Sequence, residues 1–222
     1  MPLAKLAARV MTGKTLEELG FIEEKRPKHF SVKEAILPFI KFPGVDTILG
    51  PEMKSTGEVM GIGSSFGKAF AKSQLSANGS IPTDGTAFLS VKDKDKPQAV
   101  RLAKELFSIG FKIIATRGTA AAINQSGIPA EPVLKVKEGR PHIVDKIKNG
   151  EVNLVINTPI GKSSLRDSYS IRRTALVCNI PYCTTIPGAF AATHGIKALK
   201  EGKLSVSSLQ EYHQAKDLLS KA

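Results

Sequence analysis

The sequence lacks long apolar runs and has few cysteines, and each absence excludes a class of protein. No stretch of about 18 or more apolar residues occurs, so no membrane span is predicted. The two cysteines, Cys178 and Cys183, are too few for a disulfide framework or a zinc site. The four histidines are scattered without metal-ligand spacing. No apolar signal-peptide core follows Met1, and a cytoplasmic protein with reduced thiols is expected.

Aromatic residues are also scarce, at 6% of the 222 residues, although the chain carries a net charge of +12. Residues 81–222 contribute most of this charge, which predicts an anionic partner. Single-stranded nucleic acid needs aromatic stacking platforms among the basic loops, and the sequence does not place them there. No helix-turn-helix, zinc-finger or RNA-binding signature occurs either. Nucleic acid is therefore not expected as the partner, whereas a phosphate ligand or an acidic protein face is compatible with the charge.

From Ala87 onward, apolar strands alternate with amphipathic helices through short links. The strands are apolar throughout, as in a parallel sheet that is covered on both faces. This alternation predicts an α/β fold with a doubly wound parallel sheet. The predicted strands are residues 87–91, 111–116, 132–136, 153–157 and 182–185, and the predicted helices are residues 96–110, 120–127, 141–150, 164–178, 188–202 and a last one from about 207.

Residues 1–80 do not share this rhythm. Helices are predicted at 2–13, 15–20 and 64–75, and prolines interrupt the segment between the last two. These elements are too few to bury a core alone, so this part is expected to belong to a larger domain or to pack on the second one. A stretch rich in Ser, Gly, Pro and Asn, residues 76–85, predicts the boundary, giving domains at 1–80 and 81–222.

Polar side chains collect where the predicted strands end. In an open parallel sheet, ligands bind outside the carboxyl ends of the strands. The side chains at or just after those ends are Ser90, Lys92, Lys94, Lys96, Thr116, Gly118, Thr119, Lys135, Lys137, Asn157, Thr158, Thr184 and Thr185. The helix that begins near Thr116 offers unpaired N–H groups, and Gly118 allows close approach of a ligand. The conjunction predicts an anion pocket.

Each of these residues also has a plain structural interpretation. A threonine before a helix commonly caps it, so Thr116 or Thr119 alone carries no ligand assignment. The run from Lys92 to Lys96 alternates lysine with aspartate and is typical of a solvated loop. Only their occurrence at one edge of the sheet favours the pocket.

Several long motifs resemble one family. The segment "HFSVKEAILPFIKFPGVDTILGPEMKSTGEVMGIG", preceded by "PLAKLAARVM" and followed by "EGRPHIVDKIKNGEVNLVINT" and "DSYSIRRTAL", is similar to the C-terminal part of the carbamoyl-phosphate synthetase large chain. The resemblance extends over essentially all 222 residues. It implies the end of the second ATP-grasp unit, mainly helical, at residues 1–80, and a methylglyoxal-synthase-like regulatory domain at 81–222.

The resemblance also implies a biochemical setting. The family makes carbamoyl phosphate from bicarbonate, ammonia and two ATP with magnesium, for pyrimidine and arginine biosynthesis, and its large chain works with a glutaminase small chain. The metal-binding carboxylate of the second unit would precede Met1. We therefore expect a fragment that holds no cofactor itself, has no catalytic residues, and is not a competent ligase alone.

The family's regulatory domain binds a nucleoside monophosphate, UMP or IMP. The resemblance assigns effector contacts to Ser90, Lys96, Thr116, Gly118, Thr119, Lys135, Asn157 and Thr158. It assigns an ornithine-type activator site to Glu34, Tyr182 and Thr184. One departure concerns Pro159, which stands where the bacterial pattern has a second threonine after Asn-Thr and which offers neither hydroxyl nor N–H.

The alternative is a stand-alone enzyme of the methylglyoxal-synthase type, which shares the implied fold. Its chemistry needs a carboxylate base and histidines in the phosphate pocket. After the strand at 153–157, the sequence has no Asp or His at the corresponding place. Regulation is therefore the favoured interpretation.

Overall fold

The computed structural model describes residues 2–24, 26–42, 44–47, 53–55, 57–77, 79, 81–158 and 168–214. Its strands are β1 (Phe30–Ile36), β2 (Gly57–Gly63), β3 (Thr86–Val91), β4 (Lys112–Thr116), β5 (Ala130–Val133), β6 (Leu154–Thr158) and β7 (Tyr182–Cys183). Its α-helices are α1 (Leu3–Met11), α2 (Phe66–Ser76), α3 (Lys96–Ser108), α4 (Arg117–Gln125), α5 (Ile143–Lys148), α7 (Tyr169–Val177), α8 (Ile186–Glu201) and α9 (Leu209–Gln214). Short 3-10 turns are η1 (Phe39–Lys41) and η2 (Asp93–Asp95).

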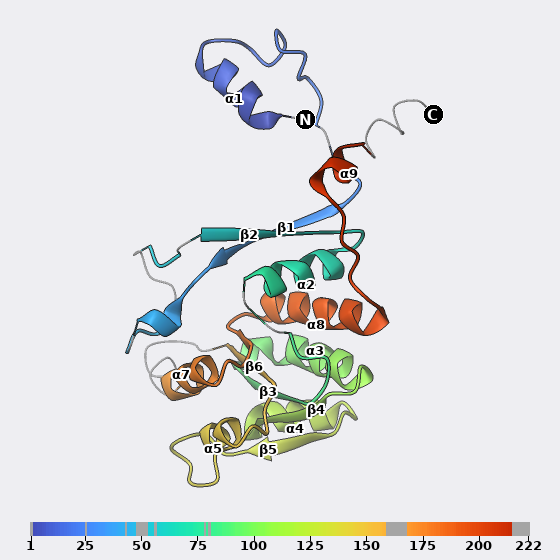
Figure 1. Cartoon of the computed structure of the whole chain (residues 1–222). Coiled ribbons are helices and arrows are strands. Elements are labelled where there is room, and N and C mark those ends of the chain that lie inside the picture. The colour runs from blue at the N-terminus through green and yellow to red at the C-terminus, as the bar shows by residue number, and fades with distance from the viewer. Residues whose placement is uncertain are drawn as a thin grey trace.

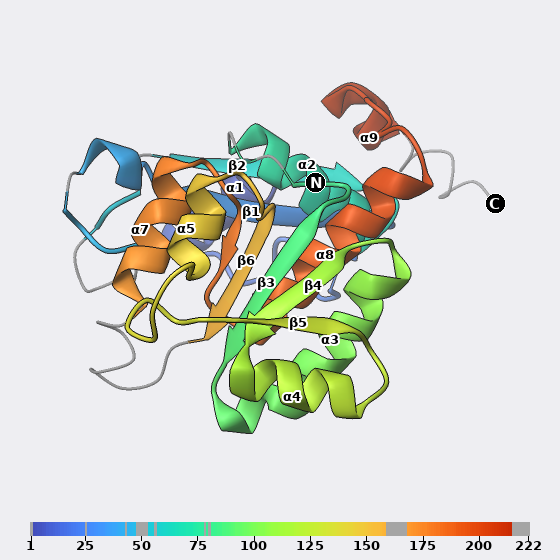
Figure 2. The same cartoon turned by 90° about the horizontal axis from the view of Figure 1, so that it is seen from below.

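Strands β3 to β7 form one parallel sheet in the order β5-β4-β3-β6-β7. Helices α3, α4 and α8 cover one face, and α5 and α7 cover the other (Figure 2). The predicted doubly wound α/β fold is confirmed. Because both faces are covered, β6 is buried along its whole length and β3 is buried from Ala87 to Leu89, which explains their apolar sequences.

Two apolar clusters fill the space between the sheet and its helices. Leu89, Ile113 and Ile156 point to the α3–α4–α8 side, where they meet Leu102 and Ile196. On the other face the cluster consists mainly of Phe88, Ile114, Val155, Ile143, Ile147 and Ile171. Neighbouring residues of one strand thus enter opposite clusters, as strand geometry requires.

The N-terminal part is less helical than predicted. Strands β1 and β2 pair antiparallel from Phe30↔Gly63 to Ile36↔Gly57, and neither strand was foreseen. The half-buried positions of β1 alternate with exposed ones, which is a strand period hidden by charged residues on both faces. The helix predicted at residues 15–20 is wrong, because the chain there forms turns that close at Gly20, whose φ of 65° is left-handed.

Helix α2 joins the N-terminal part to the parallel-sheet part. It packs on β1 and β2 on one side and on α8 on the other (Figure 1). A Cβ at Gly67 would overlap the carbonyl oxygen of His194 in α8, and one at Gly61 would overlap the carbonyl oxygen of Ala69 in α2. These glycines are what allow the layers to approach so closely. Helix α2, which ends where the predicted boundary at 76–85 begins, therefore already packs on α8 of the second part.

Candidate functional site

A cavity of about 610 Å³ lies at the carboxyl ends of the parallel strands. The strand order reverses direction between β3 and β6, so this edge is the topological switch point at which open α/β sheets bind ligands. The predicted effector residues that line the cavity are Ser90, Thr116, Lys135, Asn157 and Thr158. They come from the ends of β3, β4 and β6 and from the segment after β5, and the structure brings them together.

The start of α4 forms one wall. Helix α4 begins at Arg117, immediately after β4, and the side chain of Thr116 makes no capping hydrogen bond to it. Instead the Thr116 hydroxyl donates to Oγ1 of Thr119 at 3.3 Å, and Thr119 also accepts the N–H of Val91 at 3.4 Å. Thr119 is buried behind Thr116, with its hydroxyl engaged inside the protein. The simple N-cap role weighed for Thr116 does not occur, which leaves first-turn N–H groups available to an anion.

Two lysines approach this helix start from different segments. Lys96 is the first residue of α3, and its Nζ lies 3.4 Å from the position that a Cβ at Gly118 would occupy. Its ammonium group therefore lies over the first turn of α4. Lys135 lines the cavity from the segment after β5. Two cations and a helix N-terminus at one place favour a small dianion such as a phosphate monoester.

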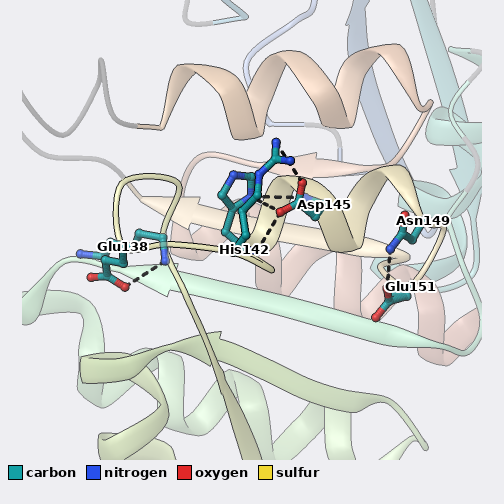
Figure 3. A network of polar contacts seen from close by, with 7 residues as sticks. Glu138, His142, Asp145, Asn149 and Glu151 are labelled. Carbon is teal, nitrogen blue, oxygen red and sulfur yellow. Dashed lines mark hydrogen bonds and ion pairs between the residues drawn. The ribbon is translucent and has the colours of Figure 1, made fainter.

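Carboxylates also reach the cavity. The Asp93 carboxylate pairs with Lys96 at 2.8 Å, and Lys96 followed by Lys135 lowers the pKa of Asp93. Glu138 accepts the backbone N–H of Lys135 at 3.0 Å (Figure 3). Lys92 pairs with Asp95 at 3.4 Å. The lysine-rich run thus forms local ion pairs, as a solvated loop would, while Lys92 and Asp93 line the cavity.

The loop that carries Lys135 is anchored at its far end. His142 and Asp145 form a capping box at the start of α5: Asp145 Oδ2 accepts the N–H of His142 at 3.0 Å, and Nδ1 of His142 accepts the N–H of Asp145 at 3.4 Å (Figure 3). The hydrogen bond from the His142 N–H lowers the pKa of Asp145. His142 is buried and forms a parallel β-bridge with Leu134, which closes the loop. This fixes both ends of the segment that presents Lys135 and Glu138.

The far wall is formed by the end of β6. The Asn157 amide donates to the carbonyl oxygen of Ser90 at 3.3 Å, while its Oδ1 accepts the hydroxyl of Tyr182 at 2.9 Å. The Thr158 hydroxyl accepts the N–H of Lys92 at 3.3 Å. Both residues are buried, so the polar groups of β6 hold the neighbouring strand ends in register as well as facing the cavity. Pro159 and the rest of residues 159–167 lie outside the described residues.

The predicted ornithine-type residues line a second cavity of about 410 Å³. Glu34 enters it from β1, and Tyr182 and Thr184 enter from the end of the sheet. The Glu34 carboxylate accepts hydrogen bonds from Ser73 at 3.1 Å and from Gln74 at 2.5 Å. Glu34 thus lies in a strand, and its side chain faces α2.

Tyr182 connects the two cavities, because it lines the second one while its hydroxyl binds Asn157 in the first. Burial raises the pKa of this hydroxyl, so it stays protonated and donates.

We expect the substitution Tyr182→Phe to lower the free energy of unfolding by about 1 kcal/mol, because it removes the hydrogen bond to Oδ1 of Asn157 together with the interaction of the hydroxyl with the buried Arg172. Urea denaturation measures the change. An unchanged midpoint would show that the bond contributes nothing to the folded state.

A buried ion pair near this wall was not foreseen. Arg172, at 1% exposure, lies in α7 and binds both carboxylate oxygens of Asp46, with Nε to Oδ1 at 2.6 Å. Burial is the largest single effect and lowers the pKa of Arg172, but the Asp46 carboxylate, followed by Tyr182, outweighs it and keeps the pKa above its ordinary value. Arg172 thus faces inward from α7 and holds the segment at residues 44–47. The only sequence signal was Arg172 at an otherwise apolar face of its helix.

Among the residues that the structure describes, no group of three or more His, Cys, Asp or Glu side chains could hold a metal ion. Within the same ranges, no helix is both long and apolar enough to cross a membrane. Burial raises the pKa of the Cys183 thiol to about 12, whereas Cys178 is exposed.

Comparison with known proteins gives one consistent result. A family model described as an MGS-like domain matches residues 98–184. The carbamoyl phosphate synthase large chain of Pseudomonas putida is 58% identical over 212 residues, which is 95% of this chain and 20% of that protein. The large chains of Nostoc sp. and Archaeoglobus fulgidus are 53% and 51% identical, over 96% of this chain and 19% and 20% of theirs. The chain thus spans about a fifth of the length of these relatives.

Among solved structures, a methylglyoxal synthase from Elizabethkingia anophelis is similar with a TM-score of 0.43 and 20% identity, over 51% of this chain and 79% of that one.

Proposed function

We propose that this chain, which corresponds over 95% of its length to part of the carbamoyl phosphate synthase large chain, is an effector-binding region that takes a nucleoside monophosphate such as UMP or IMP. The observation that carries the proposal is that Thr116 and Lys135 line the cavity at the strand ends, beside the uncapped start of α4, over which Lys96 lies. A phosphate monoester matches this set in charge, in size and in its need for several N–H and O–H donors.

The proposed binding mode assigns each wall a part of the ligand. The phosphate lies at the first turn of α4, where Lys96 and Lys135 neutralise its charge and Thr116 supplies a hydroxyl. Gly118 leaves the backbone open to the phosphate oxygens. The ribose and base extend toward Ser90, Asn157 and Thr158. The site binds and releases its ligand without a covalent step.

The regulatory consequence concerns the complete enzyme. Binding would bias carbamoyl phosphate synthesis, which uses ATP and magnesium, in a cytoplasmic assembly of the large chain with its glutaminase small chain. Such coupling between sites is typically about 1–3 kcal/mol. The pathways served would be pyrimidine and arginine biosynthesis. The cavity that contains Glu34, Tyr182 and Thr184 is proposed to take an ornithine-type amino acid, whose ammonium group suits a carboxylate.

The alternative of a stand-alone methylglyoxal-synthase-like enzyme has less support. The relatives at 51–58% identity are named as carbamoyl phosphate synthase large chains. Production of methylglyoxal from dihydroxyacetone phosphate by the purified chain would revive it.

Isothermal titration of the chain with UMP and with IMP tests the proposal. At least one of the two nucleotides is expected to bind with a 1:1 stoichiometry, and the matching nucleoside, uridine or inosine, is expected to bind far more weakly because it lacks the phosphate. Absence of binding by both nucleotides at millimolar concentration would contradict the proposed function.

A further inference from the structure

The alternating run after β3 places an aspartate at the mouth of the cavity. The run from Lys92 to Lys96 forms two ion pairs, Lys92 with Asp95 and Lys96 with Asp93, and the partners in each pair are three residues apart in the sequence. The two pairs differ in their position. Asp95 is largely covered and does not line the cavity, whereas Asp93 lines it and its side chain is 94% exposed. Asp93 is therefore free to move away from Lys96 into solvent.

The partner of Asp93 is one of the two cations assigned to the ligand phosphate. The Asp93 carboxylate lies 2.8 Å from Nζ of Lys96, and that ammonium group lies over Gly118 at the start of α4. Lys135, on the other side of the cavity, also stabilises the charged form of Asp93, which puts the carboxylate within the field of both lysines. An anion of the chain itself thus occupies part of the environment that suits a phosphate.

We infer that Asp93 is an intramolecular competitor of the effector phosphate, held on Lys96 in the free chain and displaced when the phosphate arrives. This inference rests on the proposed function. An exposed ion pair is weak, so its release opposes binding only moderately, and repulsion between the remaining carboxylate and the phosphate adds to the effect. Asp93 thereby sets the affinity for phosphate-bearing ligands without taking part in their recognition.

The test compares the wild-type chain with Asp93→Asn by isothermal titration with UMP and IMP. Asparagine has the size and turn preference of aspartate but cannot neutralise Lys96. We expect Asp93→Asn to bind the nucleotide about threefold or more tightly than the wild type, the range that release of an exposed pair allows. The gain should shrink in the Lys96→Met background, where Asp93 has no ammonium group to occupy and only its repulsion of the phosphate remains.

Asp84→Asn is the matched control. Asp84 is exposed and precedes the opposite end of β3, about 20 Å from the cavity, which is beyond the Debye length of about 10 Å at 0.1 M salt. Its substitution removes the same charge and should leave the affinity unchanged. An equal gain in Asp84→Asn, or no gain in Asp93→Asn while the wild type binds, would overturn the role of Asp93 and leave the proposed function standing. Failure of every variant to bind UMP or IMP would overturn the proposed function instead.

Discussion

Replacing Asp46 by asparagine is expected to lower the free energy of unfolding by about 2 to 3 kcal/mol. The Asp46 carboxylate binds Nε and Nη2 of Arg172, whose side chain is 1% exposed. The neutral amide would remove the carboxylate charge from beside the buried guanidinium group, and one N–H of the amide would face an N–H of the arginine. The value is below that of a fully buried pair because the Asp46 side chain is 31% exposed.

Urea denaturation of the chain measures this effect, and Glu58→Gln provides its control. Glu58 forms an ion pair of 2.6 Å with Lys33 on the two-stranded sheet, but both side chains are more than 60% exposed. We expect a change below about 1 kcal/mol for Glu58→Gln. Equal effects of the two substitutions would contradict a structural role for the Asp46–Arg172 pair.

Replacing Lys135 by alanine is expected to weaken UMP or IMP binding by tenfold or more. A charge-assisted hydrogen bond to a phosphate contributes about 1.5–3 kcal/mol, which is at least a factor of ten in the dissociation constant. Of the two lysines assigned to the phosphate, Lys96 forms an ion pair with Asp93, whereas no ion pair of the Lys135 ammonium group is seen in the described part of the chain. The backbone N–H of Lys135 is held by Glu138. The loss should therefore appear in ligand binding, with little change in the unfolding midpoint.

Lys104→Ala is the control for Lys135→Ala. Lys104 lies on the exposed side of α3, so its removal lowers the net charge by the same amount away from the cavity. We expect the affinity of this variant to stay within about twofold of the wild type, since exposed charges far from a ligand are screened. An unchanged affinity in Lys135→Ala would remove Lys135 from the site.

The parallel-sheet fold could be predicted because its signals are local. Apolar runs of five or six residues separated by amphipathic stretches define β3, β4 and β6 and the helices near them, and Pro97 and Gly110 mark the ends of α3 correctly. Strand β5 (Ala130–Val133) is shorter and begins two residues before the strand predicted at 132–136, because two of its four residues are exposed and carry no apolar signal. Strands β1 and β2 could not be predicted in this way. Charged residues such as Lys33 and Glu34 stand on both faces of β1, and its pairing with β2 connects segments that are far apart in the sequence.

The location of the candidate site could be predicted for a topological reason. Residues at the carboxyl ends of parallel strands must meet at one edge, so Thr116 and Asn157 could be brought together from the sequence alone. Which side chain faces the cavity could not. Thr119 lies behind Thr116 because helix geometry turns it toward Val91, and the contact of Asp46 with Arg172 spans 126 residues.

The central claim is that a phosphate monoester binds where β3, β4 and β6 end, at the first turn of α4. The most direct test is to titrate the isotopically labelled chain with UMP and with IMP and to measure the NMR chemical shifts of its backbone amides at each ligand concentration. We predict that the amides of Ser90 to Lys96, Thr116 to Thr119, Lys135 and Asn157 shift together on a single binding curve, while those at the starts of the same strands, such as Thr86 and Lys112, stay in place. Shifts that concentrate on the N-terminal strands or on the amino ends of the sheet, with α4 unaffected, would contradict the account.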